Sequence, residues 1–261
     1  MDLVTSVVLE WLEQHLWPLT RVSAMIGSMA LFSGTLVNAR IKVFLSLAII
    51  LAVSPALPEV STGVEMTSVG GFLVTAQQVV IGVALGLVSL LFLQIFVLGG
   101  QVIAMQIGLG FASMVDPTNG QQVPVIAQFF LMLASLIFLA FDGHLLMIHM
   151  IMASFDAIPV GMTGLDADAF MAIAEYGSVM FSAALAAMLS GVIAILLINL
   201  SFGVMTRAAP QLNIFAIGFP ITMVSGLVVL WLTMGGFIFH FENQWQRAIE
   251  VMCTVIGSQC S

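Results

Sequence analysis

The sequence has little charge, and acidic residues outnumber basic ones. Only 7% of its 261 residues are charged, five basic and thirteen acidic, which gives a net charge of -8. An ordinary soluble domain carries about a quarter charged residues. Proteins that bind nucleic acid present clustered Lys and Arg, whereas here only Arg40 and Lys42 lie close together. The composition therefore argues against an ordinary soluble domain and against a nucleic-acid partner.

The sequence also lacks the motifs of common enzyme and metal sites. No glycine pair is followed by the Lys and Ser/Thr of a phosphate-binding loop, and no HExxH occurs. His144 and His149 are five residues apart, which places them off a single helical face. Ser190-Gly191 resembles part of a serine nucleophile site, but no partner can be assigned to it. We therefore expect a protein that is not an enzyme, with no catalytic residue, no bound metal and no cofactor.

Cysteine is scarce and confined to one end of the chain. Cys253 and Cys260 are seven residues apart, a spacing that matches no zinc motif. They close a small disulfide loop if this end faces an oxidising compartment, and two free thiols are the equal alternative.

What the sequence has instead is long uncharged stretches in a chain that is 61% hydrophobic. Each of the four longest exceeds the roughly 20 residues that cross a 30 Å hydrocarbon core as a helix. We predict an all-α integral membrane protein with about six apolar segments, at residues 16–36, 41–57, 70–98, 123–155, 176–206 and 213–240. By the positive-inside rule, the turns that hold Arg40, Lys42 and Arg207 face the cytoplasm, and both chain ends face outward.

Several of these segments are poor copies of a plain membrane anchor. The fourth carries Asp142-Gly143-His144 in its middle, and a charge at membrane depth is costly unless it meets water or a partner. This stretch is therefore either bent into a hairpin or shielded inside an assembly. Prolines near segment ends also predict bent and discontinuous helices that are covered by protein.

Small residues recur at four-residue spacing, as in Gly82/Gly86 and Ala183/Ala187/Gly191. Such spacing lets neighbouring helix backbones approach closely, although Gly and Ala are also common in membrane helices for other reasons.

A polar stripe crosses the third apolar segment, where Gln94 and Gln101 are seven residues apart and share a helix face. Such a stripe needs water or a hydrogen-bonding neighbour, and bonding to an adjacent helix is the more frequent reason for an amide in a membrane helix.

Residues 108–120 predict a flexible loop, because glycines, a proline and an Asn-Gly pair disfavour a helix. The loop also carries bulky apolar side chains. It is either a lipid-facing re-entrant turn or a hydrophobic plug that can be pushed aside. The candidate plug residues are Gly108, Gly110, Phe111, Met114, Val115, Asp116, Pro117 and Gly120.

Residues 206–220 contain more than a topology-setting turn requires. Arg207 is placed to meet exposed carbonyls at a helix end, Pro210 to start the next helix, and Gly218 with Pro220 to bend it. A plain turn explains the charge of Arg207 but not the side-chain amides of Gln211 and Asn213. The candidate assembly residues are Arg207, Pro210, Gln211, Asn213, Phe215, Gly218 and Pro220.

These residues resemble the FliR/SctT family of type III secretion export gates. The resemblance rests on Arg207-x-x-Pro210-Gln211-x-Asn213-x-Phe215-x-x-Gly218, on the loop from Phe111 to Pro117, and on Asp142-Gly143-His144 followed by Ile158-Pro159-Val160-Gly161. Length and segment order match over the whole chain.

The resemblance implies a core subunit of the flagellar export gate in the basal body, in the bacterial inner membrane. One copy would join five FliP and four FliQ subunits, with FlhB and FlhA as later partners and unfolded flagellar proteins as cargo. It implies a FliP-like part at about 1–175 fused to a FliQ-like part at about 176–261, lifted partly out of the bilayer and in contact with membrane lipid.

The competing interpretation is a secondary transporter or channel for a small solute. It requires ionisable groups that converge near the membrane midplane, and only Asp142, His144 and His149 qualify. A scaffold with no conducting surface is a third alternative.

Overall fold

The structure is a computed structural model, and it describes residues 2–33, 37–58, 64–109, 124–161, 163–208 and 218–258. Within these ranges every regular element is helical, so the predicted all-α class is confirmed. The α-helices are α1 (Asp2–Ser28), α2 (Ala30–Ser33), α3 (Ala39–Val53), α4 (Val69–Gln106), α6 (Val125–Ala140), α7 (Gly143–Ala157), α8 (Ala167–Ala208), α9 (Phe219–Thr233) and α10 (Phe237–Ile256). Short 3-10 turns, η1 (Ser54–Ala56) and η4 (Met234–Gly236), extend α3 and connect α9 to α10.

Four helical stretches in the described part of the chain are long and apolar enough to cross a membrane, namely 39–56, 69–106, 167–208 and 219–256. The pair of α6 and α7 qualifies only together, and it is bent by 66°. These five stretches overlap five of the six predicted apolar segments. The remaining segment, 16–36, falls within and just after α1, where Gln14, His15 and Arg21 make the helix too polar for a conventional span.

The bend between α6 and α7 lies at the Asp142-Gly143 step that the sequence singled out. Asp142 has a φ of 53°, a left-handed conformation that interrupts helical geometry, and its carbonyl accepts hydrogen bonds from the Leu145 and Leu146 amides. A Cβ built on Gly143 would lie 2.6 Å from the Phe138 ring. The stretch is thus bent, as one of the two predicted alternatives required, although the chain turns by much less than a hairpin would require.

The chain divides into two compact units. The first comprises residues 1–91, 138–177 and 247–261, and the second comprises residues 92–137 and 178–246. The predicted FliP-like part, at about 1–175, and FliQ-like part, at about 176–261, are defined by resemblance to other proteins and not by compactness. That division stays a prediction.

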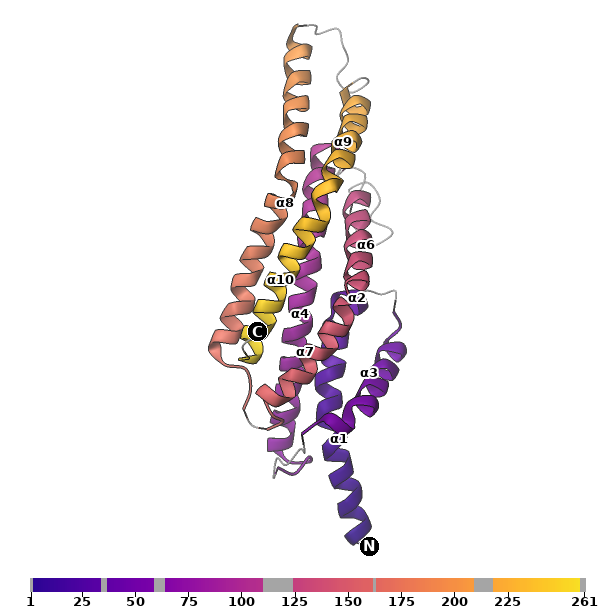
Figure 1. The fold of residues 1–261 in the computed structure, drawn as a ribbon, viewed down its shortest axis with the longest axis vertical. Coiled ribbons are helices and arrows are strands. Elements are labelled where there is room, and N and C mark those ends of the chain that lie inside the picture. Colours follow the sequence, from indigo (N-terminus) through magenta and orange to yellow (C-terminus); the bar gives the residue numbers. More distant parts are fainter. Residues whose placement is uncertain are drawn as a thin grey trace. The chain divides into compact units, whose positions relative to one another are not determined.

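In the first unit, α1 packs along residues 69–91 of α4 (Figure 1). A Cβ built on Gly82 would lie 2.2 Å from the Arg21 carbonyl oxygen, and one on Gly86 would lie 2.0 Å from Ser28 Oγ. The two backbones are therefore nearly in contact, which confirms the close approach predicted from this glycine pair. Trp17 adds a hydrogen bond from its Nε1 to Thr75 Oγ1 at 3.1 Å.

The core of the second unit is aromatic. Residue pairs from α4, α6 and α10 meet with ring centroids 4.9 to 5.7 Å apart, distances typical of favourable aromatic packing. The cluster consists of Phe92, Phe96, Phe130, Phe237, Phe241 and Trp245.

Large apolar side chains are exposed along three helices. On α3, Phe44 is 68% exposed; on α8, Leu200 is 63% exposed; on α9, Trp231 is 73% exposed. Contiguous apolar surface of this kind requires lipid or another protein to cover it.

Candidate functional site

The candidate site lies in the second unit, where α4 ends and the predicted plug loop begins. Of the plug residues, only Gly108 belongs to the described part of the chain, and those from Gly110 to Gly120 lie outside it. The geometry that can be stated is therefore that of the root of the loop, residues 106–108.

The end of α4 is set by local backbone chemistry. The Ile107 amide still donates to the Ile103 carbonyl at 3.1 Å, but the Gly108 amide donates to Met105 at 3.2 Å, so the last turn tightens. Gly108 then adopts a φ of +84°, which residues with a side chain rarely adopt. Glycine thus allows the chain to turn out of the helix at this position.

Two residues of α9 hold this root from the side. A Cβ built on Gly108 would lie 2.8 Å from Phe219 Cε2, so the Phe219 ring packs directly against the Gly108 backbone. Further along α9, by roughly two helical turns, a second contact forms. A Cβ built on Gly226 would lie 2.0 Å from Ile107 Cγ2, so Ile107 occupies the space that this glycine leaves open.

A third contact comes from α8. Asn199 Nδ2 donates to the Gln106 carbonyl at 3.1 Å. The last carbonyls of a helix have no partner within the helix, so this bond satisfies a group that would otherwise need water. Sequence reasoning did not single out Asn199, although an amide in the middle of an apolar helix was a detectable signal.

The predicted assembly turn, residues 206–220, ends beside the root of the loop, because Phe219 packs against Gly108. Arg207 lies exposed in the last turn of α8, the position predicted for it, where a positive charge favours the unpaired carbonyls. Pro210, Gln211, Asn213 and Phe215 lie outside the described residues. Gly218 is the residue before α9, and Pro220 lies in the first turn of that helix. Proline fits there since that amide has no helical partner. The residues just before Gly218 lie outside the described part of the chain, so the bend expected at Gly218 and Pro220 stays a prediction.

The predicted polar stripe is only partly sheltered. Gln94 and Gln101 are both half-buried on α4, between neighbours such as Phe92 and Ile103 that are fully buried. Their role in a conduit stays a prediction.

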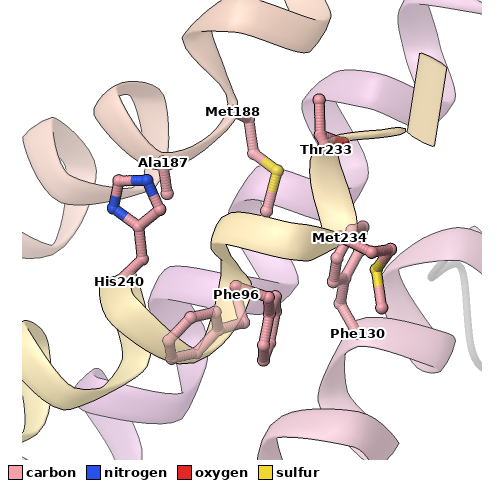
Figure 2. Close-up of a pocket in the computed structure, with 8 residues that line it drawn as sticks. Phe96, Phe130, Ala187, Met188, Thr233, Met234 and His240 are labelled. Carbon is pink, nitrogen blue, oxygen red and sulfur yellow. The ribbon is translucent and has the colours of Figure 1, made fainter. Parts of the chain in front are cut away.

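A small hollow in the second unit is lined mostly by apolar groups. Figure 2 shows Phe96, Phe130, Met188 and Met234 around it, with His240 and Thr233 as its polar residues. The Thr233 hydroxyl donates to the Leu230 carbonyl at 2.9 Å, so its proton is already bonded within its own helix. His240 is the one titratable residue of the lining. This lining offers a small polar solute little to bind.

The ionisable residues of the bent pair do not form a binding cluster either. Asp142 and His149 are exposed, and His144 is half-buried. Among the described residues, no group of three or more His, Cys, Asp or Glu is arranged to hold a metal ion. Cys253 is buried and disulfide-bonded, and the other cysteine of the chain, Cys260, lies outside the described residues.

The most distinctive polar feature of the first unit was missed by sequence reasoning. Arg21 is fully buried, and its guanidinium donates to Gln78, Ser154 and Ile158 from α4 and the end of α7. Arg21 was not singled out from the sequence, although an Arg inside the predicted apolar segment 16–36 is itself a signal.

Comparison with known proteins gives one consistent result. The family model for bacterial export proteins, family 1, matches residues 12–248. The flagellar biosynthetic protein FliR of Pectobacterium carotovorum subsp. carotovorum is 38% identical over 95% of both chains, and that of Escherichia coli K12 is 37% identical over 95% of both chains. The FliR protein of Aquifex aeolicus is 28% identical over 96% of both chains.

Proposed function

The chain belongs to the bacterial export proteins, family 1, and on that premise we propose that it forms part of the conduit that carries unfolded flagellar proteins across the bacterial inner membrane. In this proposal it is a structural subunit of the export gate in the flagellar basal body and performs no chemistry. The observation that carries the proposal is the root of the loop, residues 106–108, where a 38-residue helix ends and two other helices, α8 and α9, hold the chain.

The physical requirements of such a conduit agree with this sequence. Unfolded cargo has mixed composition, so the wall of its passage should avoid fixed charge and specific binding groups. The uncharged helices α4, α6 and α9 agree with that requirement. The polar amides of Gln94 and Gln101 are suited to water in the passage.

The plug is proposed to be residues 108–120. Phe111 and Met114 would seal the passage by apolar contact, which excludes ions yet yields to a passing chain. A plug must move while its root stays fixed, and the contacts of residues 106–108 with Asn199, Phe219 and Gly226 supply such a root.

The proposed partners are five FliP and four FliQ subunits, with FlhB and FlhA engaged later. The exposed apolar faces of α3, α8 and α9 support this, because a subunit that is surrounded by other subunits and by lipid leaves such faces uncovered when alone. The residues 207–220 are proposed to direct assembly.

The experiment that tests the proposed function deletes residues 110–120 in the assembled gate. We expect ions to leak through the gate while flagellar proteins are still exported, because the seal is lost but the passage remains. Measurements of membrane potential and of secreted flagellar protein in the same cells read the two effects separately. A deletion that stays tight to ions and still exports would exclude the plug. A deletion that exports nothing despite normal assembly would show that the loop does more than seal.

A further inference from the structure

We propose that Arg21 is a positioning residue that fixes the carboxyl end of α7 against α1 and α4, so that the three helices of the first unit fold as one cooperative block. The proposal concerns the folded state of this chain alone and stands whether or not the proposed export function is correct.

The guanidinium of Arg21 reaches two other helices at once. Nε donates to Gln78 Oε1 on α4 at 2.7 Å. Nη1 donates to the Ser154 carbonyl at 2.8 Å and to Ser154 Oγ at 3.1 Å, and Nη2 donates to the Ile158 carbonyl at 2.8 Å. All these acceptors are uncharged, and the side chain is fully buried. The positive charge is therefore stabilised by oriented dipoles of α4 and α7.

The acceptors on α7 belong to the end of that helix. Ile158 is the residue that terminates α7, and the Ser154 carbonyl accepts a hydrogen bond from its amide at 2.9 Å. The last carbonyls of a helix carry a partial negative charge, so a buried guanidinium is well suited to them, and the Ser154 carbonyl accepts it as a second donor. Phe155 adds a cation–π contact, with its ring centroid 4.2 Å from Arg21 Cζ.

Arg21 is itself held firmly on its own side. Its carbonyl lies where α4 approaches α1 most closely, at Gly82. Trp17 bonds to Thr75 one turn before it, and the Ala30 amide donates to Ser89 Oγ further along at 3.4 Å. Because α1 and α4 are fixed in register, the direction of the Arg21 guanidinium fixes the position of the carboxyl end of α7 against these two helices.

Only arginine meets these requirements. Its planar group carries five donors in fixed directions, which can serve acceptors on two helices at once, whereas the ammonium of lysine is a single point. If α7 moved away, the buried charge would lose three of its four acceptors. The position of α7 and the burial of Arg21 are therefore one cooperative event.

The test measures position as well as stability, because replacing a buried charge by an apolar residue often leaves stability unchanged. Spin labels are introduced through a non-canonical amino acid at Gly27 on α1 and Asp156 on α7, in the full chain in lipid nanodiscs. A Cβ at Gly27 would meet no atom within 4 Å, and Asp156 is exposed, so both sites accept a label. Labelling in this way avoids the native cysteines.

Arg21→Met keeps the length of the side chain and removes the guanidinium. We expect the distribution of distances between the two labels to broaden roughly twofold, since the end of α7 is no longer fixed. Arg21→Lys should restore only part of the narrow distribution. Arg40→Met is the matched control, because Arg40 is exposed, and it should leave the distribution unchanged.

A narrow distribution in Arg21→Met, equal to that of the unchanged chain, would overturn the proposal and reduce Arg21 to a packing residue. If Arg21→Met does not accumulate, Arg21→Lys is measured in its place, and a fully narrow distribution there would equally overturn it.

A second measurement introduces Gln78→Leu both into the unchanged chain and into the Arg21→Met variant. We expect the effect of Gln78→Leu on the unfolding equilibrium to be about tenfold larger in the unchanged chain, where Arg21 is present. Equal effects in the two chains would also contradict the proposal.

Discussion

Gly108 at the end of α4 lies directly under the ring of Phe219, the first residue of α9. The two residues come from the two segments that the sequence marked as separate sites, the predicted plug loop and the predicted assembly turn. Their contact shows that these segments share one anchoring point within the second unit. A shift of the amino end of α9 would therefore also shift the root of the loop.

Gly108→Ala tests whether this root needs glycine. Alanine is strained at a φ of +84°, and its Cβ would press on the Phe219 ring. We expect a loss of about 1–2 kcal/mol in the free energy of unfolding. Gly203→Ala on α8 is the control, because its Cβ would meet nothing within 4 Å and alanine favours a helix. Thermal unfolding in detergent compares them, and equal stability of the two variants would show that the root tolerates a side chain.

Asn199→Leu removes the bond from α8 to the Gln106 carbonyl. The loss should cost about 1–3 kcal/mol if that carbonyl stays dry, and it should increase ion leakage through the assembled gate because the root loosens. Ser201→Ala is the comparison, since Ser201 is exposed and bonds only within its own helix. If Asn199→Leu leaks no more ions than Ser201→Ala does, Asn199 plays no part in sealing the gate.

Gly82→Ala tests the contact between α1 and α4. The new Cβ would lie 2.2 Å from the Arg21 carbonyl oxygen, a backbone atom that cannot rotate away. The helices must separate, and we expect a loss of about 1–3 kcal/mol, typical of overpacking. Gly27→Ala on α1 has free space and should be neutral or slightly stabilising. The amount of folded protein in the membrane, read by size-exclusion chromatography, reports the difference.

Arg207→Gln should hinder assembly before it hinders transport. Its loss from the last turn of α8 removes roughly 0.3–1 kcal/mol of favourable interaction with the helix end and a charge that sets topology. Native gel electrophoresis measures the assembled fraction, with Arg40→Gln as the control. A complex that is fully assembled but inactive would assign Arg207 to transport instead.

The sequence predicted the features that follow from local chemistry. Long uncharged runs predicted apolar helices, the Gly82/Gly86 spacing predicted close packing, and Arg207 lies at a helix end as expected. These predictions succeed because composition and spacing within one helix determine them.

The errors concern relations between distant segments. Arg21 was not singled out from the sequence, because its partners, Gln78 and Ser154, are far away in the sequence and meet it only in the fold. The segment 16–36 is not among the candidate spans, because Gln14, His15 and Arg21 lower the apolar content of α1.

The most direct test of the account is to isolate the full chain from native bacterial membrane in mild detergent, identify its companions by mass spectrometry, and reconstitute the chain alone in liposomes. We predict a complex with the FliP and FliQ subunits, since the exposed faces of α3, α8 and α9 need partners, and no solute uptake by the chain alone. A self-sufficient monomer that moves a small solute in pure liposomes would contradict the account.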